Sequence, residues 1–289
     1  MINYLLLSLS IVLSTGRNIL SKSLSDIRFG TRRFFLCQGI LFFSGGIALV
    51  LFGKTDFSSL ALTTLIYAVV YAALLIFAQW FYMAALAKGN TVLCSTVYSL
   101  GFILPTLSGA ILWSEPLSTL DALGICCAAC AIVASGLKKK TGEKAAKTYY
   151  FIPLVIAMLS SGGLGIVQKL QQKSVYAEQK SLFLLIAFIL ASAASLLIAL
   201  LSKEDNAPKP SKEKLAAASC IGVCFGCCNL VNTTLAGRLP SALFFPTLNI
   251  GVILLSTVLG VLVFKEKLTK KDYSVLLLGG AAILLLNIG

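Results

Sequence analysis

The sequence contains no histidine, and its 11 acidic residues are outnumbered by 24 lysines and arginines. Enzyme sites within membranes are usually built from clusters of histidine, aspartate and glutamate, often around a metal. None of the acidic residues falls in the middle of a long apolar stretch. We therefore predict no catalytic residue, no metal site and no cofactor, and we expect that the protein is not an enzyme.

Charge of either sign is scarce, because charged residues make up 12% of the chain and hydrophobic residues 58%. Soluble domains carry roughly 25% charged residues. Ten apolar stretches approach the length of about 20 residues that a spanning helix needs. An open sheet is too costly in lipid, and the stretches lack the alternation of barrel strands. The sequence predicts an all-α integral membrane fold with ten transmembrane helices, at Ile2–Leu20, Phe34–Phe52, Leu62–Leu86, Thr91–Trp113, Leu120–Leu137, Tyr149–Val167, Leu182–Leu201, Leu215–Ala236, Ala242–Phe264 and Tyr273–Ile288.

The net charge of +13 has a membrane explanation. Lysines and arginines gather after the first, fifth, seventh and ninth predicted helices, which is the pattern of cytoplasmic loops. We expect these loops inside, both termini outside, the lipid bilayer as a partner and no nucleic-acid partner. The expected location is the plasma membrane, of bacterial type. The chain has no Walker A sequence, the phosphate-binding motif of many ATPases, so we expect no ATP hydrolysis by the chain itself.

Nine cysteines include two C-x-x-C spacings, Cys127 with Cys130 and Cys224 with Cys227. In a soluble loop such spacings suggest zinc or redox chemistry. Here both pairs lie in apolar stretches, so we interpret them as small packing residues. The Gly222-x-x-x-Gly226 spacing is likewise interpreted as helix packing.

The chain repeats itself at an offset of 151 residues. Gly109 corresponds to Gly260 and Glu115 to Glu266, and further matches include Leu117 with Leu268, Asp121 with Asp272 and Lys22 with Lys173. We predict a first five-helix repeat at 1–137, a basic linker at 138–148 and a second five-helix repeat at 149–289. An odd number of helices per repeat makes the second copy enter from the opposite side. Such inverted repeats are typical of secondary transporters, with the substrate site near the midplane.

With its two halves of five helices, the chain resembles the EamA-like ten-helix transporters of the drug/metabolite transporter superfamily. Small residues lead into the fourth and ninth helices, at Ala85–Gly89 and Leu235–Arg238, and an acidic-x-Leu-Ser/Thr turn precedes each last helix. The resemblance implies export or exchange of metabolites, amino acids or drugs. It also implies a pathway lined by helices one, three, four, six, eight and nine, with two, five, seven and ten outside.

Polar side chains in lipid mostly face the bundle interior or a wet cavity. Candidate substrate-binding residues therefore come from the helices expected to line the pathway, and they are Gln79, Tyr82, Tyr98, Asn229, Asn232, Asn18 and Arg17. Tyr71 and Gln168 lie on the same set of helices. The alternative for the amides is that they join helices structurally, and for Arg17 that it snorkels to lipid headgroups.

The first and sixth predicted helices lack the carboxylate with which small multidrug transporters exchange protons for cations. A buried cation without a counter-charge is expensive. We therefore expect a small-molecule substrate that is neutral, zwitterionic or anionic. A flippase-like carrier of a lipid-linked or amphipathic substrate is the alternative function, and a homodimer is an open alternative for the assembly.

Overall fold

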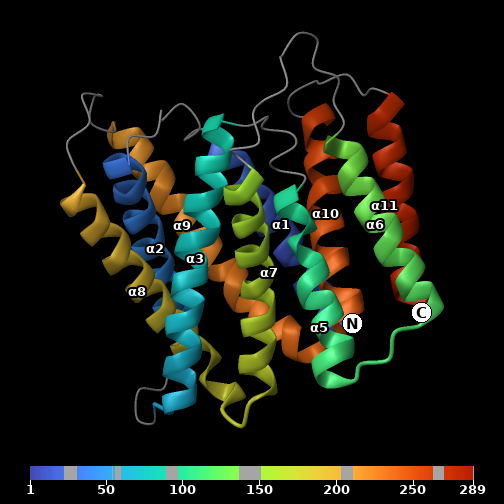
Figure 1. Ribbon diagram of the computed structural model, residues 1–289, viewed down its shortest axis with the longest axis horizontal. Helices are drawn as coiled ribbons and strands as arrows, with labels where there is room; N and C mark the ends of the chain where they lie inside the picture. Colours follow the sequence, from blue (N-terminus) through green and yellow to red (C-terminus); the bar gives the residue numbers. More distant parts are fainter. Residues whose placement is uncertain are drawn as a thin grey trace. The chain divides into compact units, whose positions relative to one another are not determined.

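The computed structural model describes residues 1–22, 31–53, 55, 60–88, 97–136, 151–202, 211–262 and 270–288. Within these residues the chain forms ten α-helices, two 3₁₀ turns and no strand (Figure 1), which confirms the prediction of an all-helical protein. The helices are α1 (Ile2–Lys22), α2 (Thr31–Phe52), α3 (Leu62–Lys88), α5 (Ile103–Trp113), α6 (Thr119–Gly136), α7 (Phe151–Lys173), α8 (Lys180–Leu201), α9 (Lys212–Arg238), α10 (Ser241–Leu262) and α11 (Lys270–Ile288). The 3₁₀ turns are η1 (Leu100–Phe102) and η3 (Ala177–Gln179).

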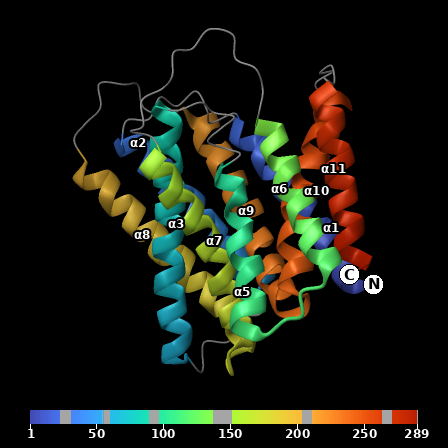
Figure 2. The same cartoon turned by 45° about the vertical axis from the view of Figure 1, so that its right-hand side comes forward.

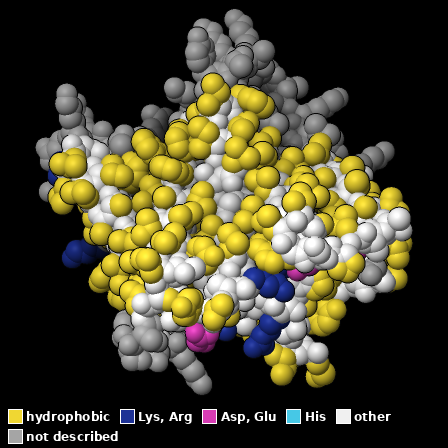
Figure 3. All heavy atoms as spheres, turned by 60° about the horizontal axis from the view of Figure 1, so that its bottom comes forward, with side chains coloured by type: hydrophobic (Ala, Val, Ile, Leu, Met, Phe, Trp, Pro, Cys, Tyr) yellow, Lys and Arg dark blue, Asp and Glu magenta, His cyan; other side chains and the backbone are white. Residues whose placement is uncertain are grey.

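Six helical segments are long and apolar enough to cross a membrane, so the chain is a multi-pass helical membrane protein. They are Arg32–Phe52, Leu62–Ala85, Phe151–Lys173, Ala177–Leu201, Lys212–Arg238 and Ser241–Leu259. Three further apolar helices are shorter, at Val97–Trp113, Thr119–Ala134 and Leu276–Ile288. Hydrophobic side chains cover much of the surface seen in Figure 3, where charged side chains are few.

Helix α3 shows the two-sided burial of a helix that lies between lipid and protein. Large apolar side chains are exposed along one side, at Ile66, Val69, Val70, Phe77 and Trp80. The other side is buried, at Ala68, Tyr71, Leu75 and Ala78. The spacing of three or four residues within each set is that of a helix face. A continuous surface of exposed isoleucine, valine, phenylalanine and tryptophan is typical of a helix that faces lipid.

The chain divides into two compact units, and each draws on both halves of the sequence. Unit 1 comprises Met1–Ile76 and Val167–Gly237, and unit 2 comprises Phe77–Ile166 and Arg238–Gly289. Helices α3 and α7 therefore begin in one unit and end in the other. The repeat boundaries at 1–137 and 149–289 stay a prediction from the sequence, and the basic linker 138–148 lies outside the described residues.

In unit 1, α2 packs most extensively against α8 (Figures 1 and 2). The rings of Phe42 and Phe188 meet edge to face, with centroids 5.9 Å apart. Helix α9 approaches α2 through glycines, since a side chain at Gly226 would collide with the backbone of Gly45 and one at Gly222 with that of Leu41. The interpretation of Gly222-x-x-x-Gly226 as helix packing is confirmed.

In unit 2, α6 packs most extensively against α11, where Gly124 gives room to Leu286. Helix α6 begins with a capping box: the Asp121 amide donates to Ser118 Oγ, and the Ser118 amide donates to Asp121 Oδ2, both at 3.0 Å. Glu115 lies in the turn after α5, and its Oε2 accepts the backbone N–H of Ser241 at 2.8 Å, at the start of α10. The Asp121 carboxylate thus caps the start of α6, and the Glu115 carboxylate caps the start of α10.

The helix bounds follow the 151-residue repeat. Shifted by 151, Thr31–Phe52 of α2 becomes 182–203, and α8 is Lys180–Leu201. The same shift takes α3 to 213–239, where α9 is Lys212–Arg238, and α6 to 270–287, where α11 is Lys270–Ile288. The strongest pairs, α2 with α8 and α6 with α11, therefore join helices in equivalent positions of the two predicted halves.

The fourth predicted helix, Thr91–Trp113, differs from a single regular helix. Its first six residues lie outside the described residues, and the 3₁₀ turn η1 precedes α5. Pro105 has no backbone N–H, so the hydrogen bond that would run from residue 105 to the carbonyl of Gly101 cannot form. The irregular turn contains Gly101 itself.

Candidate functional site

Three neutral polar side chains form a ring of hydrogen bonds inside unit 1. The hydroxyl of Tyr71 on α3 donates to Asn229 Oδ1 on α9 at 2.5 Å. Gln168 Nε2 on α7 donates to the Tyr71 hydroxyl oxygen at 2.8 Å and to Asn229 Oδ1 at 3.1 Å. All three side chains are buried, and Tyr71 is only 1% exposed. The ring thus joins α3, α7 and α9.

Each helix places its residue in the ring for a local reason. Tyr71 lies on the buried side of α3 with Ala68 and Leu75. Asn229 Nδ2 donates to the carbonyl of Phe225 one turn earlier on α9, at 2.8 Å, which fixes the amide's direction. Unpaired amides and hydroxyls are expensive away from water, so the mutual pairing is what makes this polar centre tolerable between apolar helices.

A second polar seam runs between α1 and α9. Ser10 Oγ donates to Asn232 Oδ1, and Ser14 Oγ lies 2.9 Å from Cys228 Sγ. Cys228 Sγ also lies 3.7 Å from Ser10 Oγ. Asn232 and Asn229 are adjacent turns of one helix, so α9 presents polar groups to α1 on one side and to α3 and α7 on another.

The structure places the predicted residues Arg17 and Asn18 at the same end of α1. The guanidinium carbon of Arg17 lies 4.7 Å from the ring centroid of Phe225 on α9, within range of a cation–π interaction. Arg17 Nη2 donates weakly to Asn18 Oδ1 at 3.4 Å, and Asn18 is exposed. An aromatic face of α9 thus contacts the Arg17 side chain.

The predicted residues Gln79, Tyr82 and Tyr98 belong to unit 2. The rings of Tyr82 and Tyr98 pack together with centroids 4.6 Å apart. Tyr82 also packs against the buried pair Ala85 and Leu154. Gln79 is half-buried. The predicted set is therefore divided: Asn229, Asn232, Arg17 and Asn18 lie in unit 1, and these three residues lie in unit 2.

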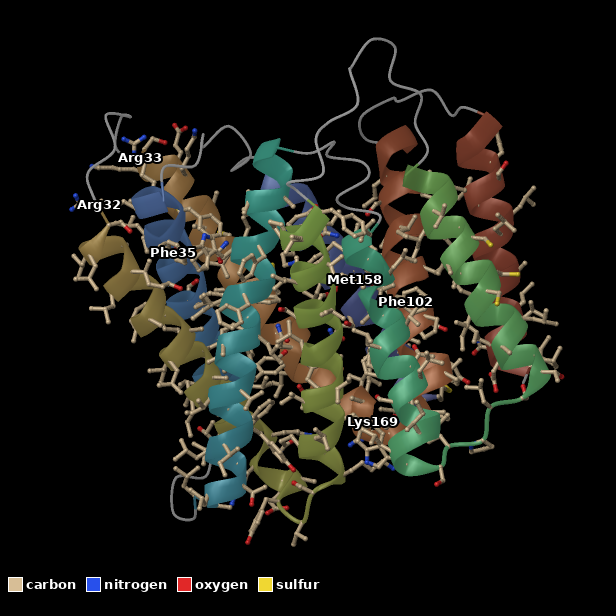
Figure 4. All side chains as sticks on the ribbon, viewed as in Figure 1. Arg32, Arg33, Phe35, Phe102, Met158 and Lys169 are labelled. Carbon is tan, nitrogen blue, oxygen red and sulfur yellow. The ribbon has the colours of Figure 1, made fainter. Side chains whose placement is uncertain are left out.

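Lys169 is fully buried on α7, directly after Gln168 (Figure 4). It is among the largest side chains with no exposed surface, and it is engaged in interactions of its own. Lysine is almost never fully buried unless it is paired. An ionisable residue at such a depth in a membrane protein is a functional candidate in its own right.

Tyr71, Gln168 and Lys169 are the residues that the predicted set lacked. Gln168 and Lys169 lie just beyond the predicted end of the sixth helix at Val167, whereas α7 continues to Lys173. The sequence repeat contained a sign of them, because the 151-residue shift takes Arg17 and Asn18 to positions 168 and 169. Each half therefore carries one basic residue and one amide at this position.

The polar ring can bind an uncharged group. Hydroxyl and amide groups both donate and accept hydrogen bonds, so the ring can bind an uncharged polar group. Carboxylates whose side chains the structure describes lie in turns or first helical turns, at Glu115, Asp121, Glu178 and Glu213. Among those same ranges, no group of three or more histidine, cysteine or acidic side chains could hold a metal ion.

The chain shares its fold with a solved protein. That structure, described as "Crystal structure of protein", has a TM-score of 0.79 and 16% sequence identity, and the match covers 99% of this chain and 96% of the other. In all, 28 solved chains match. No family model and no curated protein matches the sequence. At 16% identity the likeness shows the fold alone.

Proposed function

We propose that the chain is a secondary transporter of a small metabolite, working by alternating access between two inverted five-helix halves of the EamA-like type. It moves its substrate unchanged, as an exporter or exchanger in a bacterial plasma membrane. The substrate is neutral, zwitterionic or anionic, for example an amino-acid-like metabolite or a drug. The polar ring of Tyr71, Gln168 and Asn229 is the centre of its binding site in unit 1.

The observation that carries this proposal is that side-chain hydrogen bonds in unit 1 join helices expected to line the pathway. The side-chain pairs Tyr71–Asn229, Gln168–Asn229 and Ser10–Asn232 connect α1, α3, α7 and α9. These are the helices that the EamA-like resemblance expects along the pathway. The expected outer helices α2 and α8 meet through aromatic rings and glycines, with one hydroxyl-to-backbone bond from Ser192 to Gly39.

The repeat supports the inverted-half part of the proposal. The bounds of α2, α3 and α6 agree within two residues with those of α8, α9 and α11 after a shift of 151, and the most extensive helix contacts join equivalent helices. A pseudo-two-fold relation between halves would produce such pairs. Inverted-repeat transporters bind substrate where the halves meet, near the bilayer midplane.

An exchange assay tests the proposal. Purified protein is reconstituted into liposomes loaded with an isotope-labelled methanol–water extract of bacterial cells, and the release of each labelled metabolite is followed by mass spectrometry after unlabelled extract is added outside. A transporter releases a subset of metabolites faster than protein-free liposomes do. Release equal to that of protein-free liposomes contradicts the proposal, and accelerated flipping of a fluorescent lipid in the same vesicles would favour the flippase alternative.

A further inference from the structure

The ring of Tyr71, Gln168 and Asn229 has hydrogen-bonding capacity left over. Gln168 Nε2 donates to both other members of the ring, and the carbonyl oxygen of Gln168 is left to accept. One Nδ2 hydrogen of Asn229 goes to the Phe225 carbonyl, which leaves the second to donate. A ligand that approaches the ring would therefore find one acceptor and one donor.

Thr233 adds a third polar group on α9. Its side chain is 0% exposed, and its hydroxyl has no hydrogen-bond partner among the residues that the structure describes. Buried hydroxyls are nearly always paired, so an unpaired one calls for an explanation. Thr233 lies four residues after Asn229, and residues at this spacing share one face of a helix.

Contacts between α7 and α9 show what that face meets. Gln168 bonds Asn229, and a side chain at Gly237, eight residues further along α9, would lie 2.9 Å from Gln172, four residues further along α7. Between 229 and 237, α9 therefore runs beside the stretch of α7 from 168 to 172. Thr233 is midway along this stretch of α9, one helical turn from Asn229.

We infer that Gln168, Asn229 and Thr233 form a recognition subsite for one uncharged hydroxyl or primary carboxamide group of the transported metabolite. This inference rests on the proposed function and names the group that the site selects. A hydroxyl or carboxamide can donate to Gln168 Oε1 or the Thr233 oxygen and accept from Asn229 Nδ2. The Thr233 hydroxyl, unpaired in the structure, is paired when such a group is bound.

Charged groups fit this subsite less well. A cationic group would come close to the buried Lys169, which follows Gln168 directly on α7. The described carboxylates of unit 1, Glu178 and Glu213, lie in first helical turns. A carboxylate cannot donate to the Gln168 carbonyl oxygen, so that acceptor would stay unsatisfied. The free donor on Asn229 Nδ2 and the free acceptor on Gln168 Oε1 together therefore favour a neutral group.

The test compares Thr233→Val with wild-type protein in two steps. The exchange assay with the bacterial extract first identifies metabolites that are exchanged. The exchange rate of each such metabolite is then compared with that of an analogue that lacks the hydroxyl or carboxamide. Valine has nearly the shape of threonine and removes only the hydroxyl. The matched control is Ser195→Ala, because the Ser195 hydroxyl on α8 is also buried and unpaired in the described structure. Melting temperatures of all three proteins are measured alongside.

Wild-type protein is expected to prefer the hydroxyl- or carboxamide-bearing member by about five-fold or more, as the loss of one or two hydrogen bonds allows. Thr233→Val should lose most of this preference while melting at the same or a higher temperature, and Ser195→Ala should keep it. If Thr233→Val keeps the full preference, or if wild-type protein shows none, the subsite is wrong although the transporter proposal stands. If wild-type protein exchanges no metabolite, the transporter proposal itself fails.

Discussion

A tyrosine hydroxyl and two amides share three hydrogen bonds between buried side chains. In water such bonds contribute little net stability, because the unfolded groups bond to water instead. In a buried site, removing one hydrogen-bonding group leaves its partner without a hydrogen bond, and this costs free energy. Tyr71, Gln168 and Asn229 therefore serve structure and binding together, and substitutions must separate the two roles.

Tyr71→Phe removes one hydroxyl and leaves the ring otherwise filled. Asn229 Oδ1 loses a donor and Gln168 Nε2 loses an acceptor, so we expect the free energy of unfolding to fall by about 1–3 kcal/mol. Exchange should slow several-fold because the amides are no longer held in place. Thermal unfolding in detergent and the exchange assay measure the two effects.

Tyr67→Phe is the matched control, since Tyr67 lies one turn earlier on α3 and is only half-buried. It should leave both melting temperature and exchange near the wild-type values. Equal behaviour of the two phenylalanine variants would show that the Tyr71 hydroxyl contributes nothing to the ring.

Helices α2 and α9 are close enough to touch through their backbones. Only glycine at position 226 allows this, because a Cβ there would lie 3.1 Å from Gly45 Cα and closer still to the Gly45 carbonyl oxygen. Backbone atoms cannot rotate away as a side chain can. Gly226→Ala should therefore push α9 from α2 and lower the free energy of unfolding by about 1–3 kcal/mol.

Gly280→Ala on α11 tests whether the effect comes from contact or from helix propensity. A side chain at Gly280 would meet nothing within 4 Å, so alanine there should be neutral or stabilise the protein by about 0.5–1 kcal/mol. Opposite shifts of the two melting temperatures are the expected result. A Gly226→Ala variant that melts with the wild type would mean that α9 is not packed on α2 in this way.

The start of α10 depends on a carboxylate from another turn. Glu115 Oε2 accepts the Ser241 amide hydrogen at 2.8 Å, where the helix dipole also favours negative charge. Glu115→Gln keeps an oxygen acceptor and loses the charge, so we expect a loss of about 0.3–1 kcal/mol in unfolding free energy. Exchange should survive at least in part. Complete loss of exchange by a folded Glu115→Gln protein would instead place this carboxylate in the transport pathway.

Hydropathy predicted the helices well where their residues are apolar from end to end. The second and seventh predicted helices, Phe34–Phe52 and Leu182–Leu201, lie within α2 and α8, whose bounds extend them by two or three residues. The prediction stopped too early at Val167, because Gln168, Lys169 and Gln171 are polar, yet all three are buried within α7. Protein neighbours allow polar residues in a helix where lipid does not, and a sequence window cannot distinguish the two surroundings.

For the whole molecule, the sequence predicted the helical membrane class and the candidate Asn229, but not its partners. Three residues far apart in the chain, Tyr71, Gln168 and Asn229, meet only because α3, α7 and α9 pack together. Local periodicity places a residue on a face and leaves open which helix that face meets. Gln79, Tyr82 and Tyr98 stay predictions as substrate-binding residues.

The most direct test of the central claim is metabolite exchange by Asn229→Ala and Cys126→Ala proteins in the same liposomes. Asn229 accepts two hydrogen bonds of the ring, whereas Cys126 is exposed on α6. A transporter that binds substrate at the ring should exchange metabolites several-fold to tens-fold more slowly after Asn229→Ala, and at the wild-type rate after Cys126→Ala. Normal exchange by Asn229→Ala together with a lower melting temperature would contradict the account, because the ring would then only hold helices together.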